Sequence, residues 1–290
     1  MSLDGGRVWQ TAGGPVALDR PLLAGIINLT PDSFWEGSRV TGAVAIARAG
    51  QLLDEGADLL DLGGESTRPG ARPVTAADEI ARVMPVLEEI LRRWPAVPVS
   101  VDTVKAEVAR TALDGGAWII NDVSSLRLDP AMAGVIAARS AGVVLMHSRG
   151  NVEQMAYYEM AAYGEDVAGE VCAELRASRD HARASGICDA CIMVDPGLGF
   201  SKRTEHSIAM IAHLDRLHEL GRPIMVGPSR KRFVGEVVDA ASPLPPSERL
   251  EGTLAACVAA RLRGADVFRV HDVRATHRAL AVAEAIRAAP

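Results

Sequence analysis

Side chains that accept hydrogen bonds end three of the aliphatic runs in this chain of 290 residues. Asp102, Asn121 and Asp195 each lie at or beside the point where such a run stops. A carboxylate accepts two parallel N–H bonds from a planar amidine-like edge, and an amide binds a neighbouring donor and acceptor. The three residues therefore favour a flat heterocycle with a 2-amino-4-oxo edge as ligand, although each of them alone could instead cap the following helix.

Cationic side chains form a second set. Lys231, Arg269 and His271 lie at the last two apolar runs, and Arg68 lies in the polar stretch after the second run. Phosphate groups often bind near the last two strands of parallel barrels. Arg269 and His271 alternate with apolar neighbours, so their side chains should point the same way, and charges inside an apolar strand are seldom idle. We expect an anion site, with a solvated helix start at Ser229–Arg232 as the alternative for Lys231.

A metal ligand is expected where the first apolar run ends. Asn28 closes this run and Asp32 follows it. Mg²⁺ prefers oxygen ligands and usually keeps waters and substrate phosphates, so one protein ligand can suffice. We predict that Asn28 binds Mg²⁺, although no sequence pattern establishes this alone.

Other catalytic motifs do not fit the chain. Gly197-Leu-Gly199 is followed by Lys202 where a dinucleotide-binding motif needs its third glycine, and the sequence has no Walker loop, HExxH or GxSxG pattern. Cys188 and Cys191 have CxxC spacing, but zinc would need a second pair or two histidines at matching spacing. Zinc or redox chemistry stays an alternative to incidental reduced thiols.

The elements that must position these residues are eight short apolar runs, each ending in polar residues. They are Leu22–Asn28, Leu59–Gly63, Val97–Asp102, Trp118–Asp122, Val143–His147, Ile192–Asp195, Ile224–Gly227 and Val267–His271. Segments with helical periodicity separate them. We expect a helix over Val104–Leu113 with Thr103 as its cap, and an extra short helix near Lys231–Val238. Tyr157 and Tyr158, in the long connection Asn151–Gly164, are expected to cover part of the barrel.

Eight alternations of strand and helix predict a parallel sheet, either closed into a barrel or open and doubly wound. The chain length favours the barrel, and so do the polar groups at nearly every strand end, because an open sheet collects its ligands at one switch point. We predict an α/β fold, a (β/α)₈ TIM barrel that forms a single domain over residues 1–290. Loops at about residues 28–39 and 64–74 would lie over its mouth.

Composition and charge indicate which classes of binding partner the protein has. The net charge is −6, and no broad basic stripe indicates nucleic-acid binding. No apolar stretch reaches the length of a membrane span, and the scattered cysteines without a signal peptide suggest a reducing cytoplasm. We expect a cytoplasmic enzyme that acts on small molecules.

Together, these motifs resemble those of the dihydropteroate synthase family over essentially the whole chain. The segments that carry the resemblance are Asn28–Phe34, Gly63–Gly70, Ser100–Thr103, Ile120–Val123, Met146-His147, Asp195–Phe200, Gly227–Lys231 and Arg269–Asp272. The resemblance implies a transferase of folate biosynthesis. Such an enzyme condenses 6-hydroxymethyl-7,8-dihydropterin pyrophosphate with p-aminobenzoate to give 7,8-dihydropteroate and pyrophosphate.

The resemblance also implies a role for each motif residue. Asn28 would bind Mg²⁺, and the catalytic residues would be Arg68, Lys231, Arg269 and His271. The pterin would be held by Asp102, Asn121, Asp195, Lys231 and Gly227, with Met146 and Phe200 against its faces. Thr67, Arg68, Arg269 and His271 would meet the pyrophosphate, and Phe34, Pro69 and Ser229 would frame p-aminobenzoate.

Enzymes of this kind are commonly homodimers, so the resemblance implies a homodimer. Two features depart from the usual pattern, Trp35-Glu36 in the first loop and Pro228 before Ser229, but they replace no expected ligand. The alternatives are a corrinoid-dependent methyltransferase with the same pterin edge, a pterin-binding protein without catalysis, and a sugar-phosphate enzyme on the same barrel. The Ser-Thr-Arg-Pro and Ser-Arg-Lys segments favour the synthase over the methyltransferase.

Overall fold

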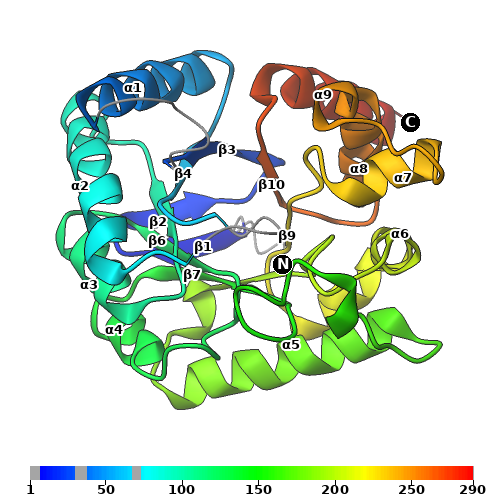
Figure 1. Cartoon of the computed structure of the whole chain (residues 1–290), viewed down its shortest axis with the longest axis horizontal. Coiled ribbons are helices and arrows are strands. Elements are labelled where there is room, and N and C mark those ends of the chain that lie inside the picture. The colour runs from blue at the N-terminus through cyan, green and yellow to red at the C-terminus, as the bar shows by residue number, and fades with distance from the viewer. Residues whose placement is uncertain (1–6, 30–37, 67–72, 290) are drawn as a thin grey trace, which may run out of the picture.

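The computed structural model describes residues 7–29, 38–66 and 73–289, and within them eight parallel strands form a barrel (Figure 1). The barrel strands are β3 (Leu22–Asn28), β4 (Leu59–Gly63), β5 (Val99–Asp102), β6 (Ile119–Asp122), β7 (Gly142–Met146), β8 (Ile192–Asp195), β9 (Met225–Val226) and β10 (Val267–Val270). They neighbour one another in the order β8, β7, β6, β5, β4, β3, β10, β9. A bridge between Val194 and Ile224 joins β8 to the segment that leads into β9 and closes the ring. The predicted TIM barrel is confirmed.

Helices surround the strands (Figure 1). They are α1 (Ser38–Asp54), α2 (Ala76–Arg93), α3 (Ala106–Asp114), α4 (Met132–Ala138), α5 (Val167–Ala184), α6 (Thr204–Ala212), α7 (Arg232–Val238), α8 (Leu250–Leu262) and α9 (Val273–Arg287). Helix α2 shows why they form. The Thr75 side chain accepts a hydrogen bond from the N–H of Asp78 at 3.1 Å, and Val83, Leu87 and Ile90 recur at helical spacing and are fully buried.

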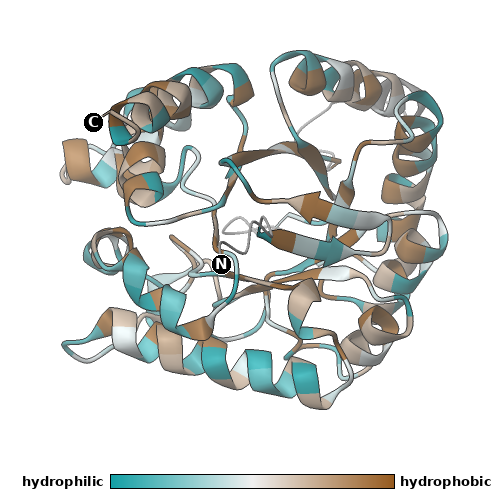
Figure 2. Ribbon diagram, turned by 180° about the vertical axis from the view of Figure 1, so that it is seen from behind, coloured by the Kyte–Doolittle hydropathy of each residue, from teal (hydrophilic) through white to brown (hydrophobic). Residues whose placement is uncertain are grey.

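The strands are apolar along nearly their whole length because both of their faces are covered. In Figure 2 the central strands are largely brown, whereas the surrounding helices mix brown with teal. Among the described residues, no helix has both the length and the apolar character to cross a membrane.

A two-stranded hairpin, β1 (Val8–Thr11) and β2 (Gly14–Ala17), precedes the barrel and was not expected. Trp9 on β1 is completely buried, and its indole N–H donates to the carbonyl of Cys191 at 2.7 Å. Trp9 packs with residues at the beginnings of the barrel strands, including Leu22, Leu59 and Val267. The hairpin therefore covers the end of the barrel at which the strands begin.

Local details differ from the sequence-based expectations. Helix α3 begins at Ala106, and the expected cap Thr103 instead accepts a hydrogen bond from the N–H of Lys105 at 3.2 Å. The cap is displaced because Asp129, from the loop after β6, accepts the first helical N–H, that of Ala106, at 2.7 Å. Strands β7 and β10 end one residue earlier than expected, so His147 and His271 follow their strands.

Candidate active site

The barrel mouth contains a cavity of about 820 Å³. Residues from the carboxyl ends of several strands and from the loops after them line it. The expected site residues on its wall are Asn28, Asp102, Phe200, Ser229, Lys231, Arg269 and His271. Phe34, Thr67, Arg68 and Pro69 lie outside the described residues. Side chains from distant parts of the chain thus meet at one rim, as the parallel barrel requires.

The expected acceptor residues occupy neighbouring strand ends. Asp102 on β5 pairs in register with Asn121 on β6, and Met146 on β7 pairs with Asp195 on β8. Asn121, Asp195 and Met146 are buried. The structure therefore brings the three acceptors and Met146 to one arc of the barrel, β5 to β8.

Arg269 lies directly against this acceptor arc, at Asp102. Its guanidinium donates to Asp61 at 2.7 Å through Nε and to Asp102 at 2.8 Å through Nη2. The reason is electrostatic, because two carboxylates this close inside a barrel need a cation between them. Gly227 lies beside this arginine, since a Cβ at Gly227 would be 3.8 Å from the Cβ of Arg269.

Asp61 is a site residue that sequence reasoning missed. It is 2% exposed and lies in the middle of the apolar strand Leu59–Gly63. A lone carboxylate in such a strand was the available signal, because buried charges are almost always paired.

Burial and nearby charges shift the pKa values of the ionisable side chains in and beside the acceptor arc. Burial raises the pKa of Asp102 to about 7, with Arg269 opposing the rise and Asp61 adding to it. Burial also raises the pKa of Asp195, while Lys231 opposes this rise. Lys231 in turn has its pKa lowered by burial to about 8, despite the attraction of Asp195. Groups that titrate near neutral pH are typical of functional sites.

Lys231 is positioned by the turn after β8. Its ammonium donates to the carbonyl of Leu198 and lies 4.2 Å from the centre of the Phe200 ring. Gly199 has a left-handed backbone (φ 75°), and a Cβ there would lie 3.2 Å from the Lys231 side chain. Glycine at this position therefore allows the lysine to pass close to the turn.

Ser229 and His271 are in direct contact. The Ser229 hydroxyl accepts from the backbone N–H of His271 at 3.1 Å and lies 2.9 Å from its Nδ1. Arg48, which the sequence did not single out, lines the cavity and donates to the carbonyl of His271 at 2.6 Å. Arg230, between the two cavity residues Ser229 and Lys231, has φ 55°, in the left-handed region that residues other than glycine rarely adopt.

Glu65 ties the two ends of the second loop together. One carboxylate oxygen accepts from the N–H of Val74 at 2.7 Å, and the other accepts from Lys105 at 2.9 Å. Lys105 also binds the fully buried Glu79 at 2.6 Å. These contacts fix Glu65 and Val74, which precede and follow residues 67–72 in the sequence.

Asn28, the expected magnesium ligand, lies on the wall of the cavity. Its Oδ1 lies next to Gly63, where a Cβ would be 3.7 Å away. Within residues 7–29, 38–66 and 73–289, no three His, Cys, Asp or Glu side chains form a metal-binding group. An amide oxygen that needs substrate phosphates to complete the coordination is the arrangement that suits Mg²⁺.

The CxxC pair lies away from this cavity. Cys188 is exposed and Cys191 is buried, and both are free thiols. Burial raises the pKa of Cys191 to about 11, which disfavours the reactive thiolate.

Comparison with known proteins gives the family. Residues 24–271 match the model of the family described as pterin binding enzyme. Dihydropteroate synthase from Neisseria meningitidis serogroup B is 43% identical over 286 residues, which cover 97% of this chain and 98% of the relative. The enzyme from Synechocystis is 41% identical over 268 residues, covering 92% and 90%. The chain belongs to the dihydropteroate synthase family.

Similar solved structures belong to the same family. Dihydropteroate synthase from Xanthomonas albilineans with 4-aminobenzoic acid has a TM-score of 0.89 at 43% identity, over 98% of this chain and all of that one. The same enzyme in complex with 7,8-dihydropteroate has a TM-score of 0.85 at 40% identity, with the same coverage. The enzyme from Yersinia pestis in a sulfonamide drug complex has a TM-score of 0.89 at 37% identity, over 97% of this chain and all of that one. The predicted family and the predicted barrel are therefore both confirmed.

Proposed function

We infer that this dihydropteroate synthase condenses 6-hydroxymethyl-7,8-dihydropterin pyrophosphate with p-aminobenzoate, yielding 7,8-dihydropteroate and pyrophosphate. The observation that carries this conclusion is one cavity in which the acceptor Asp102 and the cations Lys231 and Arg269 meet. The Xanthomonas albilineans neighbours bind 4-aminobenzoic acid and 7,8-dihydropteroate, which are the second substrate and the product of this reaction.

The acceptor arc is proposed to hold the pterin. Asp102, Asn121 and Asp195 would accept from the amino and ring N–H groups, while Lys231 would donate to the ring's acceptors. Met146 and Phe200 would cover its two faces, and Gly227 would give the ring room. Arg269, between Asp61 and Asp102, offsets the cost of leaving these carboxylates ionised around a neutral ligand.

The pyrophosphate is proposed to lie towards Asn28 and His271, with Arg269 at the boundary between the two halves of the substrate. Thr67 and Arg68 would complete this end from the second loop. Mg²⁺, held by Asn28 and the phosphates, would supply charge neutralisation for the leaving group. Removal of the ion with a chelator should abolish turnover, and Asn28→Ala should raise the Mg²⁺ concentration that half-maximal activity requires.

The chemistry proposed for the cavity is a dissociative substitution at carbon. The C–O bond to pyrophosphate breaks with its electron pair going to oxygen, and the electron-rich dihydropterin shares the positive charge left on the methylene. The arylamine nitrogen, unprotonated at neutral pH, then forms the new C–N bond. Arg68, Arg269 and His271 would stabilise the growing charge on the leaving group. The loops at residues 28–39 and 64–74 would exclude water that could trap the cation.

The p-aminobenzoate is proposed to lie among Phe34, Pro69 and Ser229. The Yersinia pestis neighbour binds a sulfonamide drug. We propose that sulfonamides occupy the same place in this enzyme, so that they inhibit in competition with p-aminobenzoate.

The reaction is tested by mixing the purified chain with both substrates and Mg²⁺. Dihydropteroate and pyrophosphate should appear in equal amounts, and omission of p-aminobenzoate should prevent dihydropteroate formation. Pyrophosphate release at the same rate without p-aminobenzoate would show a hydrolase instead of a synthase.

A cytoplasmic homodimer is proposed as the working form. Large apolar side chains are exposed on three neighbouring helices, with Val237 and Val238 on α7, Leu262 on α8, and Val282 and Ile286 on α9. The three helices lie together on one flank of the barrel (Figure 1). Apolar side chains on neighbouring elements support an interface with a second copy.

A further inference from the structure

Lys202 is a buried lysine on the wall of the reaction cavity that the roles described above do not use. It is 1% exposed and follows the turn that carries Phe200. Its amine bonds to Nδ1 of His147 at 2.7 Å and donates to the carbonyl of Phe200 at 3.2 Å. Neither partner carries a negative charge at neutral pH. Lys105 differs in this respect, because its ammonium binds the carboxylates of Glu65 and Glu79.

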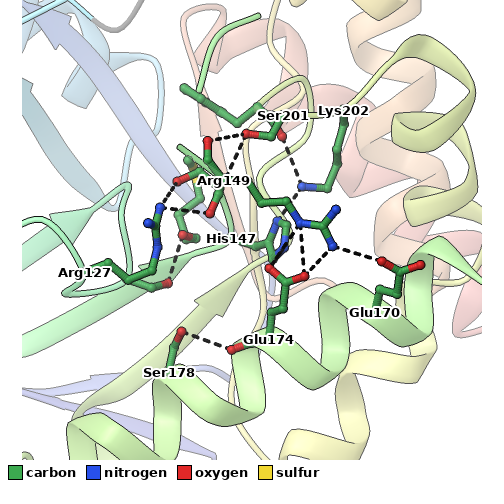
Figure 3. A network of polar contacts seen from close by, with 12 residues as sticks. Arg127, His147, Arg149, Glu170, Glu174, Ser178, Ser201 and Lys202 are labelled. Carbon is green, nitrogen blue, oxygen red and sulfur yellow. Dashed lines mark hydrogen bonds and ion pairs between the residues drawn. The ribbon is translucent and has the colours of Figure 1, made fainter. Parts of the chain in front are cut away.

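His147 continues the chain of contacts away from the cavity. Its Nε2 lies 3.0 Å from a carboxylate oxygen of Glu174 on α5. Figure 3 shows the Lys202 amine directed at the imidazole of His147, with Glu174 on the other side of the ring. Glu174 keeps 42% side-chain exposure, and both His147 and Glu174 line a second cavity of about 570 Å³. The hydrogen-bonded series Lys202, His147, Glu174 therefore leads from the reaction cavity to the second cavity.

The direction of the hydrogen bonds follows from the charges. Burial raises the pKa of Glu174, but hydrogen bonds from His147 and Arg149 outweigh this and lower it to about 2, so the carboxylate is ionised. Burial is the main cause that lowers the pKa of His147, to about 4, so the ring is neutral. A neutral ring that donates from Nε2 to a carboxylate has a free electron pair on Nδ1. Lys202 must therefore donate to Nδ1.

We propose that Lys202 is the base that takes up the proton released in the condensation, with His147 and Glu174 as the positioning residues that carry this proton to solvent. When the arylamine nitrogen forms the C–N bond it becomes a cationic adduct with two hydrogens. The adduct either loses a proton or expels the arylamine again. Removal of one proton therefore prevents loss of the arylamine and makes formation of the C–N bond irreversible.

The proton balance is complete along the chain. The adduct gives a proton to the electron pair of Lys202 Nζ, directly or through one water. Lys202 then gives a proton to Nδ1 of His147, Nε2 gives its proton to Glu174, and Glu174 releases it to solvent at the second opening. This leaves His147 protonated at Nδ1, and proton exchange with water in the second cavity, which His147 also lines, restores the Nε2–H form before the next turnover. The pyrophosphate keeps the electron pair of the broken C–O bond, and no oxidant or reductant is needed.

Burial of Lys202 disfavours its charged form, and the neighbouring charges act in both directions. Burial holds the pKa of Lys202 well below its ordinary value. Asp195 on β8 and Glu174 on α5 favour the charged form, whereas Lys231 and Arg149 oppose it. The ring of Tyr163 lies 5.9 Å from the amine. A lowered pKa increases the share of the neutral amine, which is the form that a general base needs.

The test is single-turnover product formation across pH 6–9, together with calorimetric measurement of pterin affinity. Lys202→Met should slow product formation by roughly 100-fold, a usual loss for a general base, and leave the pterin dissociation constant within about threefold. Lys202→Arg should be equally slow, because arginine keeps the hydrogen bond to His147 but stays protonated. Wild-type turnover by Lys202→Arg would overturn the proposal, and so would a loss of pterin affinity as large as the loss of rate.

A matched pair of variants on α5 keeps the proposal falsifiable if the lysine variants do not fold. Glu174 and Glu170 both bind Arg149, but of the two only Glu174 also binds His147. Glu174→Gln should slow product formation severalfold or more without a change in pterin affinity, whereas Glu170→Gln should behave as the wild type. Equal effects of the two substitutions would mean that the network around Arg149 acts only on stability, which would refute the exit route.

Discussion

At the scale of single residues, the sequence indicates which side chains belong to the site. It does not indicate which of them are in direct contact. Asp102 and Arg269 could be singled out because charged and polar residues at the ends of apolar strands are seldom idle. Their direct contact could not be predicted, since it joins positions 167 residues apart and depends on how the barrel closes. Asp61 was missed although its place in an apolar strand was a signal. Its partner, Arg269 on β10, is 208 residues away in the sequence, so their contact could not be predicted.

The ionisation of Asp102 leads to a pH prediction. Its pKa is raised to about 7, and only the ionised carboxylate accepts two N–H groups from the pterin. Pterin affinity should therefore rise as the pH increases from 6 to 8, and calorimetry corrected for ligand titration measures this. Asp102→Asn should abolish the rise. Asp61→Asn should move its midpoint to lower pH, because Asp61 helps to raise the pKa of Asp102; an unchanged midpoint would contradict the coupling.

Replacement of Arg269 tests the ion-pair cluster. Arg269→Ala would leave Asp61 and Asp102 buried without a cation, so the free energy of unfolding should fall by about 3–5 kcal/mol. Pterin affinity should fall as well, because Asp102 would then be protonated at neutral pH. Urea denaturation and calorimetry measure the two effects. Lost turnover with unchanged stability and unchanged pterin affinity would instead place Arg269 on the pyrophosphate alone.

At the scale of elements, the barrel strands were predictable and the hairpin was not. Strands β3, β4 and β8 begin and end where the apolar runs do, because strands covered on both faces must be continuously apolar. In the hairpin only alternate residues of β1 are buried, and its strands have four residues each. So short a pattern cannot be told from a loop by periodicity.

The hairpin should stabilise the fold without affecting catalysis. Trp9 packs at the end of the barrel where the strands begin, away from the cavity at their carboxyl ends. Trp9→Ala should lower the free energy of unfolding by about 3–5 kcal/mol and leave kcat/KM unchanged. Val8→Ala, at a 41% exposed position on the same strand, is the control and should be nearly neutral. A change in KM for either substrate in the folded Trp9 variant would contradict this separation.

At the scale of the whole molecule, the apolar flank formed by α7, α8 and α9 should bury its surface against a second copy. Ile286 on α9 is 70% exposed, so Ile286→Lys adds a charge to this flank at little cost to the isolated fold. Light scattering after size exclusion should show a dimer for the wild type and for the control Val8→Lys, and monomers for Ile286→Lys. A dimer of unchanged affinity in the Ile286 variant would place the interface elsewhere.

The whole account depends on one barrel mouth that holds a pterin at its acceptor arc and a diphosphate beside it. A crystal structure with a pterin pyrophosphate ester, Mg²⁺ and p-aminobenzoate is the most direct measurement. The account predicts the aminopyrimidine edge against Asp102, Asn121 and Asp195, with the diphosphate towards Asn28 and His271. A pterin bound outside this arc, or a diphosphate on the far side of the acceptors, would contradict it.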